Sequence, residues 1–523
     1  MKVFSTAQKK LLWICAAIIF VTRVILAFRP ESQICTRPYT EDSFYVFSCA
    51  QHLSHGDGFS VDGVQPTNGV QPLIVVLYAP IFDLCGANKW LALRLSFLLG
   101  ALIGIASMYL LARLLLIMSN APPVTTTLRT GLRTAPILGA LLWTLSYPII
   151  RETMNGLETG LYSMLILAAC LTYAEFSVRN ETKLLAWAAF GVTLGSLVLA
   201  RIDGVFFVMA FGLLEIVQHR WEGLKRAIVL GVIAFVVSLP WWIYNLRVFG
   251  SLMPTSGQSE SIANTIPENL SRGIMVIADI VSTFFYMPSY ELSALLSAVW
   301  VFVVFGVILA IFTRFSLWKS VCTRANIGIL APLGIASFAL VIFYIFFFSA
   351  PHFLPRYFQP LRILWLILFS LACAIGFAKY SSFTQRAKLL TQFAGGVVLL
   401  AAIAFSVSRY AESFNERNTT DLFYAGKWAL QHQDGLVGMN QSGTASFIAP
   451  NVINLDGKVN RDALEAKKAG TMGVYLVRKN FRYLADWKEF VDPLVRSAEA
   501  NGAQFHEIDS IGLIHFYERV DPP

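Results

Sequence analysis

Two adjacent carboxylates, Glu41 and Asp42, follow the first long apolar segment of the chain. A carboxylate held near low-dielectric surroundings has a raised pKa, so it can act as a general base toward an attacking hydroxyl group. The same residues also suit the start of a helix, because Thr40 offers a hydroxyl cap and both carboxylates then fall in the first turn. The pair alone is compatible with a catalytic base or with helix capping.

Other polar groups interrupt the apolar runs further along the chain. Ionisable residues close to the hydrocarbon boundary of a membrane are costly, and they often mark a pathway or a site. Any one of them is more often an ion pair that holds helix ends together, and Arg201 with Asp203 can simply be such a pair. Several such clusters on one side, together with the acidic pair, favour a site. Its candidate residues are Asn68, Arg151, Asn155, Glu158, Arg201, Asp203, Asn245, Gln258, Arg356 and Tyr357.

Arginines beside carboxylates at membrane depth suit transfer from a lipid-linked phosphate. The guanidinium group binds phosphate oxygens in a bidentate fork and stabilises a leaving phosphate, while a carboxylate activates the acceptor. We expect Arg356, Arg201 and Arg151 to bind the phosphate, because they are positively charged and are predicted to lie on the same side of the membrane as the acidic pair. The polar stretch 250–260 is rich in small hydroxyl residues and contains Gly and Pro, which predicts either a lid over the substrate or a plain flexible loop.

Long apolar segments must position these groups. A membrane crossing needs about 17–25 mainly apolar residues, and we interpret eleven segments as crossings. They lie near 11–28, 90–118, 135–150, 159–177, 184–200, 204–217, 226–245, 291–313, 328–349, 361–377 and 388–408. Counted alternately, the connections on one side collect most of the Lys and Arg residues, and the positive-inside bias makes that side the cytoplasm. The acidic pair and the C-terminal segment then face outward.

The composition agrees with a membrane protein. Hydrophobic residues make up 56% of the 523 residues, charged residues only 14%, and the mean hydropathy is +0.60, which excludes an ordinary soluble protein. The net charge of +9 needs no nucleic acid to explain it, because much of the excess sits in the cytoplasmic connections. The first apolar segment is too long for a cleaved signal peptide, so we expect a retained helix.

A set of short motifs resembles bacterial integral-membrane glycosyltransferases of the GT-C superfamily over about residues 11–410. Members such as protein mannosyltransferases, lipid A aminoarabinose transferases and mycobacterial arabinofuranosyltransferases use polyprenyl-phosphate sugars as donors. The resemblance implies a polytopic transmembrane helical GT-C fold with a small outer domain. The motifs are Glu41-Asp42-Ser43-Phe44-Tyr45, Pro66-Thr67-Asn68-Gly69 with Gln71-Pro72-Leu73, Asn155-Gly156-Leu157-Glu158-Thr159-Gly160, Leu199-Ala200-Arg201-Ile202-Asp203-Gly204, Pro240-Trp241 with Asn245, and Gly250-Ser251-Leu252-Met253-Pro254.

The resemblance also implies an inverting transfer of one sugar to an acceptor hydroxyl at the outer face. Asp42 takes the role of the base with Glu41 beside it, although many relatives have two aspartates there, which leaves open which of the pair accepts the proton. Some relatives bind a divalent metal near this pair, but no strong metal spacing is present. The expected partners are a polyprenyl-phosphate sugar, a lipid, glycan or protein acceptor, and the bilayer. Arabinofuranose and mannose are the sugars that the family suggests.

Two alternatives remain open at the sequence level. One is a transporter or flippase of lipid-linked sugars, which should carry charge near the membrane midplane. The other is a glycan polymerase or ligase that uses a diphosphate-linked donor. No nucleotide-binding glycine loop is present, so a nucleotide-sugar donor is not expected. We expect a multi-pass protein of a bacterial cytoplasmic membrane, with the N-terminus in the cytoplasm and the C-terminal domain outside.

The C-terminal segment has more charged residues and shorter apolar runs than the rest of the chain. We expect residues 1–410 to form the transmembrane module, with 29–89 as its first outer loop, and residues 411–523 to form a soluble α/β domain. The predicted strands lie at 437–439, 452–455, 473–477 and 511–516, and the predicted helices at 462–468 and 487–501. Asp456-Gly457 predicts a turn, or an acceptor contact. A disulfide from Cys35 to Cys49 or Cys85 is permitted outside the cytoplasm.

Overall fold

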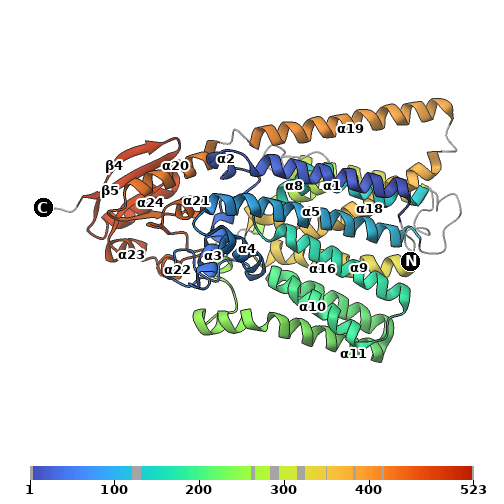
Figure 1. Ribbon diagram of the computed structural model, residues 1–523, viewed down its shortest axis with the longest axis horizontal. Coiled ribbons are helices and arrows are strands. Elements are labelled where there is room, and N and C mark those ends of the chain that lie inside the picture. Colours follow the sequence, from blue (N-terminus) through green and yellow to red (C-terminus); the bar gives the residue numbers. More distant parts are fainter. Residues whose placement is uncertain are drawn as a thin grey trace.

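The computed structural model describes residues 4–120, 131–260, 266–282, 294–314, 324–348, 350–380, 384–413 and 417–520. Most of these residues form helices, and the longest helices run side by side along the long axis of the molecule (Figure 1). A small sheet with its own helices, built from the C-terminal part of the chain, lies at one end of this bundle (Figure 1). The predicted fold class is therefore confirmed: a mainly helical protein with a small C-terminal α/β unit.

Seven helices in the described ranges are long and apolar enough to cross a membrane. Large apolar side chains point outward from them, including Trp13, which is 76% exposed, as expected of a surface that faces lipid. The long helices are α1 (Thr6–Ala27), α5 (Lys89–Met118), α9 (Thr159–Arg179), α11 (Val205–Tyr244), α16 (Arg324–Phe346), α18 (Gln359–Tyr380) and α19 (Gln385–Ser413). Three of the predicted crossings fall on shorter apolar segments, namely α7 (Ala135–Leu145), α10 (Leu184–Ala200) and Ala294–Gly306 of α14 (Ala294–Arg314), so the number of eleven stays a prediction.

Helix α11 contains two of the predicted crossings, because the chain reverses within it. Arg220 has φ 50° and ψ −118°, which breaks the helix. A side chain at Gly223 would overlap the carbonyl oxygen of Glu215, and Arg226 Nη1 lies 3.2 Å from Glu215 Oε2. In a continuous helix, residues eight positions apart are about 12 Å apart along the axis, so these contacts require a hairpin. The predicted segments 204–217 and 226–245 are its two arms.

The second arm of this hairpin packs tightly on α10. Gly191 and Gly195 lie one helical turn apart on α10, and a side chain at either position would collide with Ile233 or Val237 of α11. Small residues at this spacing let two membrane helices approach closely, since their backbones then make van der Waals contact. The glycines therefore set the position of the outer end of α11.

The predicted crossing at 135–150 is interrupted. Helix α7 ends at Leu145, Ser146 is extended with φ −74° and ψ 111°, and α8 (Tyr147–Thr153) begins immediately after it. Pro148 lies in the first turn of α8, where its missing N–H costs nothing. The break turns α8 toward the outer end of the bundle, so that Arg151 and Glu152 lie near the start of α3.

The first outer loop is largely helical. It contains α2 (Glu31–Ile34), α3 (Ser43–His55) and α4 (Pro72–Cys85), and α3 and α4 lie between the long helices and the sheet (Figure 1). The helix predicted to start at Thr40 instead starts at Ser43. Thr40 does not cap it, because its hydroxyl donates to the carbonyl of Asn155 at 3.3 Å.

Several elements connect the long helices at the end of the bundle that meets the C-terminal unit, which the sequence predicts to be the outer end. They position the polar residues of the candidate site, because each holds the chain at a helix end rather than letting it pass directly into the next crossing. These elements are η1 (Ile202–Gly204), the π-helical turn η2 (Asn245–Phe249), α12 (Thr255–Glu260), α13 (Ile266–Ser282), η3 (Pro351–Phe353) and α17 (Leu354–Tyr357).

The C-terminal sheet has five strands in the order β2-β1-β3-β5-β4. Strand β1 pairs in parallel with β2 and β3, and β5 pairs antiparallel with β3 and β4. Side chains alternate between the two faces, so the neighbours Tyr483 and Leu484 belong to different apolar clusters. The elements are α20 (Arg417–Gln431), β1 (Leu436–Met439), α21 (Gly443–Ile448), β2 (Val452–Asn454), α22 (Arg461–Lys468), α23 (Met472–Arg478), β3 (Phe481–Trp487), α24 (Lys488–Glu499), β4 (Gln504–Ile511) and β5 (Ile514–Val520).

One of the predicted strands is wrong, and another has the wrong bounds. Residues 473–477 form α23, because Gly473 lets this segment pack as a helix against the Ser497 carbonyl of α24. The strand predicted at 511–516 spans the turn between β4 and β5, where Gly512 has φ +59°. The sequence did not predict β3, which follows α23 and forms the centre of the sheet, or β4, apart from its last residue.

The C-terminal unit is docked on the first outer loop through α21. Phe447 inserts among Phe44, Phe82 and Trp90, with ring centroids 5.6 to 6.3 Å apart. Lys89 Nζ donates to the carbonyl of Phe447 at 2.7 Å. These contacts bring the loop after β2 to the outer end of the helix bundle.

The three cysteines that are predicted to face outward are not paired. Cys35, Cys49 and Cys85 are all free, so the disulfide permitted by their predicted side of the membrane is absent.

The hairpin in α11 generates a stability prediction. Gly223→Val should destabilise the protein by about 1–3 kcal/mol, because the added side chain must displace the backbone of the first arm. Thermal unfolding in detergent checks this value. Gly231→Ala is the matched control on the same arm, since nothing lies within 4 Å of an added methyl group, and it should unfold at the wild-type temperature or higher. Equal midpoints for Gly223→Val and the wild type would contradict the hairpin.

Candidate functional site

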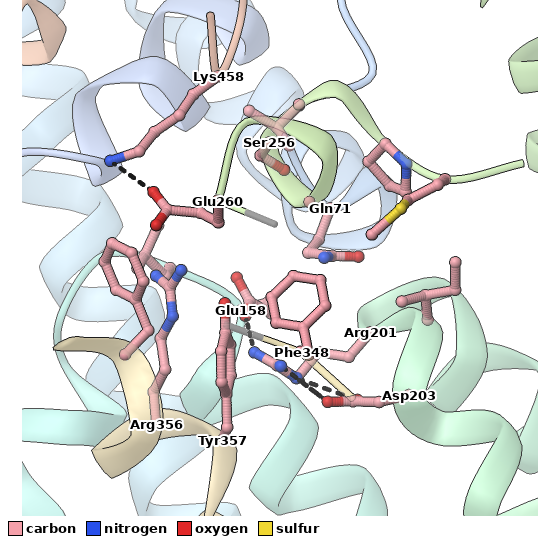
Figure 2. A pocket seen from close by; sticks show the side chains of 18 of the residues that line it. Gln71, Glu158, Arg201, Asp203, Ser256, Glu260, Phe348, Arg356, Tyr357 and Lys458 are labelled. Atoms are coloured by element: carbon pink, nitrogen blue, oxygen red, sulfur yellow. Dashed lines mark hydrogen bonds and ion pairs between the residues drawn. The ribbon is translucent and has the colours of Figure 1, made fainter. Parts of the chain in front are cut away.

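A cavity of about 530 Å³ lies where the outer ends of the long helices meet the C-terminal unit. Its wall combines aromatic and apolar side chains with a few charged groups, and Figure 2 shows these side chains pointing into a shared space. The charged lining residues are Asp42, Glu158, Arg201, Asp203, Glu260, Arg356 and Lys458. The cavity is therefore built from segments that are far apart in the sequence.

Asp42 points into this cavity from the start of α3. Its Oδ1 lies 3.4 Å from Lys458 Nζ, and its Oδ2 lies 3.9 Å from Arg356 Nη1. The side chain is 18% exposed. Burial alone would raise the pKa of Asp42, but the charges of Lys458 and Arg356 outweigh it and hold the pKa below the ordinary value. The carboxylate is therefore ionised at neutral pH.

Glu41 points away from the cavity. Its Oε1 accepts a hydrogen bond from the backbone N–H of Gly443, at the start of α21. Burial, together with the negative charge of Asp42, raises the pKa of Glu41 well above its ordinary value. The two adjacent carboxyl groups therefore differ in protonation and in direction, and only Asp42 lines the cavity.

Lys458 is the central cation of the site, and the sequence analysis missed it. It follows the predicted turn at Asp456-Gly457, where Gly457 has φ +85°. Its Nζ lies 3.4 Å from Asp42 Oδ1, 3.4 Å from Glu260 Oε1 and 3.5 Å from Asp456 Oδ2. Figure 2 shows the ion pair between Lys458 and Glu260. The turn was visible in the sequence, but no local pattern indicated that it reaches the acidic pair.

Glycine at position 69 allows this approach. A side chain there would overlap the carbonyl oxygen of Lys458, which also accepts a hydrogen bond from Thr255 Oγ1 at 2.7 Å. The motif residue Gly69 thus serves a close contact between the first outer loop and the C-terminal unit.

Arg201 lies in a closed network of buried charges. Its guanidinium group lies 2.6 Å from Glu158 Oε1 and 2.8 Å from Asp203 Oδ2, and the three side chains are only 4–5% exposed. Tyr344 donates to Asp203 Oδ2 at 2.8 Å, and Tyr357 stacks on Tyr344 with ring centroids 4.1 Å apart. The expected pairing of Arg201 with Asp203 is present. Its charge is compensated by two carboxylates at 2.6 and 2.8 Å, whereas the carboxylates around Arg356 and Lys458 lie farther away, at 3.4 to 3.9 Å.

Asn68 and Asn245 lie behind the cavity wall. The Asn68 amide donates to Asn245 Oδ1 at 3.2 Å, and Asn68 Oδ1 accepts from the Thr255 N–H at 3.0 Å. Both asparagines are fully buried and tie the first outer loop to η2 and α12. Gln258 faces the C-terminal unit, where Lys468 donates to its Oε1 at 2.7 Å. These three substrate-binding assignments stay predictions, and the structure places none of these side chains in the cavity lining.

A second cavity of about 230 Å³ adjoins the first. Asp42, Leu157, Phe353 and Arg356 line both cavities, so Asp42 lies in the wall between them. Arg151 and Asn155 belong to the second cavity and are thus separated from Arg201. The polar residues of its lining are Arg37, Thr40, Asp42, Arg151, Glu152, Asn155, Arg272, His352 and Arg356.

The residues at the acidic pair do not fit a divalent metal. Within the described part of the chain, no group of three His, Cys, Asp or Glu residues has the arrangement of a metal site. The carboxylates of Asp42, Glu260 and Asp456 instead surround the ammonium group of Lys458. A metal ion and this ammonium group would compete for the same oxygens.

The structure resembles known membrane transferases over its whole length. Neither a protein-family model nor a curated protein sequence matches the chain. ArnT from Cupriavidus metallidurans matches with a TM-score of 0.58 at 13% identity in its complex with undecaprenyl phosphate, over 98% of this chain and 99% of that one. Its apo structure matches with a TM-score of 0.54 at 12% identity, with the same coverage. The chain has the ArnT-like GT-C fold.

The predicted resemblance to the GT-C superfamily is thus confirmed at the level of the fold. The arabinofuranosyltransferase AftD from Mycobacteria also matches, with a TM-score of 0.48 at 15% identity, over 99% of this chain and 40% of AftD.

The network around Arg201 generates a prediction that separates structure from donor binding. Arg201→Met should lower the stability by about 3–5 kcal/mol even without donor, because Glu158 and Asp203 then lose their buried counter-charge. Arg356→Met is the matched control, since its partner Asp42 keeps Lys458. Thermal unfolding of the donor-free protein measures both. Wild-type stability of Arg201→Met, with a loss of donor binding alone, would instead support the predicted role of Arg201 as a phosphate ligand.

Proposed function

We propose that this protein is a glycosyltransferase that moves a single sugar from a polyprenyl-phosphate carrier to an acceptor hydroxyl at the outer face of a bacterial cytoplasmic membrane. The observation that carries the proposal is the position of Asp42. It is an ionised carboxylate in the wall between two cavities, with cations on both sides. A base at this place can take the proton from an acceptor hydroxyl in one cavity while the acceptor oxygen attacks a donor held in the other.

The larger cavity suits a donor with an apolar chain and a phosphate. Phe206, Trp242, Phe343 and Phe348 contribute apolar surface to it, while Arg356 and Lys458 contribute positive charge. Pockets that are mainly apolar and carry a few convergent polar groups are typical of such amphiphilic ligands. The fold shared with an ArnT structure that contains undecaprenyl phosphate supports the same class of donor.

The chemistry follows from these groups. The oxygen of the acceptor hydroxyl attacks the anomeric carbon of the donor, and Asp42 accepts the proton of that hydroxyl. The bond from the anomeric carbon to the phosphate oxygen breaks. Attack opposite the leaving phosphate inverts the anomeric configuration. Arg356 and Lys458 stabilise the charge that develops on the phosphate, as preorganised cations do in a partly water-excluded site. The lowered pKa of Asp42 keeps it in the basic form at neutral pH.

The orientation of the protein in the membrane is part of the proposal. The basic connections that the sequence places in the cytoplasm support a site that faces outward, with the C-terminal unit on the same outer side. We propose a division near residue 410, with a transmembrane module before it and an outer α/β domain from 411 to 523. We propose that the second cavity receives the acceptor.

Replacement of the base is the principal test. Asp42→Asn should lower turnover of a polyprenyl-phosphate sugar by about 10²–10⁴-fold, because the amide keeps the shape of the carboxylate and removes the base. Release of free polyprenyl phosphate from purified protein, with a panel of synthetic donors and acceptors, measures it. Glu41→Gln is the neighbouring control and should keep more activity, since Glu41 does not line the cavities.

Full activity of folded Asp42→Asn would overturn the assignment. Absence of Asp42-dependent release with every monosaccharide donor would instead favour a diphosphate-linked donor or transport.

The charge balance around Asp42 predicts a change in pH dependence. Lys458→Met should raise the pKa of Asp42, because one of the two cations that lower it is lost while its burial remains. The acid limb of kcat/KM should therefore move to higher pH, since more Asp42 is protonated at a given pH. Lys468→Met, which removes a cation outside the cavity, should leave the limb unchanged. An unmoved limb in Lys458→Met would show that another group controls it.

A further inference from the structure

Three carboxylates from three elements converge on Lys458. Asp42 belongs to the start of α3, Glu260 is the last residue of α12, and Asp456 belongs to the turn that carries Lys458. Arg356 is the second cation of the group. Negative charge thus exceeds positive charge around a cavity that, under the proposed function, must admit an anionic phosphate. Like charges this close repel, so an anion gains a favourable place only if one carboxylate leaves.

Two of the carboxylates are fixed in place. Asp42 contacts Arg356 as well as Lys458. Asp456 accepts a hydrogen bond from the backbone N–H of Lys458 at 2.8 Å, which closes its turn. Neither can move away without breaking a second contact.

Glu260 is held less firmly. Among the described residues, its side chain makes its polar contact with Lys458, and it is 26% exposed. A partly exposed ion pair at 3.4 Å is weaker than a buried one in direct contact, because water reaches the Glu260 carboxylate. Figure 2 shows the Glu260 carboxylate reaching across the cavity from α12, on the side of Lys458 that also faces Arg356 and Tyr357.

The rest of α12 is held by hydrogen bonds to neighbouring segments, unlike the carboxylate of Glu260. Thr255 N–H donates to Asn68 Oδ1 at 3.0 Å, and Ser259 Oγ donates to the carbonyl of Asp456 at 2.7 Å. The predicted lid is therefore clamped between the first outer loop and the C-terminal unit, and a rotation of the Glu260 side chain suffices to vacate Lys458.

We propose that the donor phosphate replaces the Glu260 carboxylate on Lys458, so that the C-terminal unit supplies a direct ligand of the donor. This inference rests on the proposed function. A phosphodiester carries one negative charge, as the departing carboxylate does, so the exchange leaves the charge around Lys458 unchanged. After transfer the phosphate monoester carries more negative charge, and the return of Glu260 to Lys458 competes with it. Glu260 thus acts as an internal competitor for the phosphate subsite.

The exchange predicts that substitutions of Glu260 and Lys458, the two partners of one ion pair, change the affinity for undecaprenyl phosphate in opposite directions. Glu260→Gln should bind undecaprenyl phosphate about three- to tenfold more tightly than the wild type, because the competing charge is gone. Lys458→Met should bind it at least tenfold more weakly, and Lys458→Arg should recover most of the loss. If the pair only stabilised the fold, both Glu260→Gln and Lys458→Met would weaken binding or leave it unchanged.

The measurement is equilibrium binding of undecaprenyl phosphate to the full-length protein in detergent, with undecaprenol as the uncharged probe. Undecaprenol should bind all variants equally, since it lacks the phosphate. Lys468→Met is the matched control: it loses its contact with Gln258 at the same interface but leaves the cavity intact, and its affinity should be that of the wild type. Thermal unfolding shows that each variant is folded.

The outcomes are distinct. Tighter binding by Glu260→Gln that is specific for the phosphate, together with weaker binding by Lys458→Met, supports the exchange. Unchanged or weaker binding by folded Glu260→Gln overturns the exchange and leaves the proposed function in place. Absence of phosphate-specific binding to the wild type overturns both.

Discussion

Charge compensation at the end of an apolar helix bundle is the constraint on which the site depends. Asp42 lies beside low-dielectric surroundings, where an isolated carboxylate would take up a proton. Lys458 and Arg356 keep it ionised, and they come from segments more than 300 residues away in the chain. The outer end of the bundle is thus organised around the need to pair this one charge, and the pairing joins the first outer loop, α17 and the C-terminal unit.

The same need for charge compensation explains why Arg201 and Arg356 differ in their surroundings. Arg201 stands between Glu158 and Asp203 with little exposure, and its removal would leave two buried carboxylates unpaired. Arg356 contacts a carboxylate at a longer distance, and its buried Nε has no hydrogen-bond partner within the described structure. A cation with spare donor capacity next to a cavity suits an anionic ligand, whereas a fully compensated one suits a fixed wall.

The C-terminal unit is part of the site as well as a neighbour of it. Phe447 and Lys89 dock it on the first outer loop, and that docking carries the turn before Lys458 to Asp42. Two glycines allow Lys458 to approach Asp42. Gly457 adopts a positive φ in the turn before Lys458, and Gly69 has no side chain that would overlap the Lys458 carbonyl. A site assembled this way depends on the docked arrangement, so the proposed transfer and the packing of the C-terminal unit are physically coupled.

The long apolar helices and the resemblance to the GT-C fold could be predicted from the sequence, and the structure confirms both. Apolar length and loop charge are local properties, so they can be read without knowing any contact. The sequence also identified Asp42 and Arg356, which lie together at the cavity. The prediction failed for residues 473–477, where an apolar run of strand length favoured a strand and packing of Gly473 against α24 allows a helix.

Only the tertiary structure decided which of the adjacent carboxylates faces the cavity and which cation stands beside it. Glu41 turns away because the N–H of Gly443 on α21 binds it, and Lys458 reaches Asp42 because the C-terminal unit docks on the first outer loop. Neither contact has a local signature, since the partners are about 400 positions apart in the sequence. Direction and pairing of side chains depend on packing between distant segments, and the periodicity of one segment carries no information about its partner.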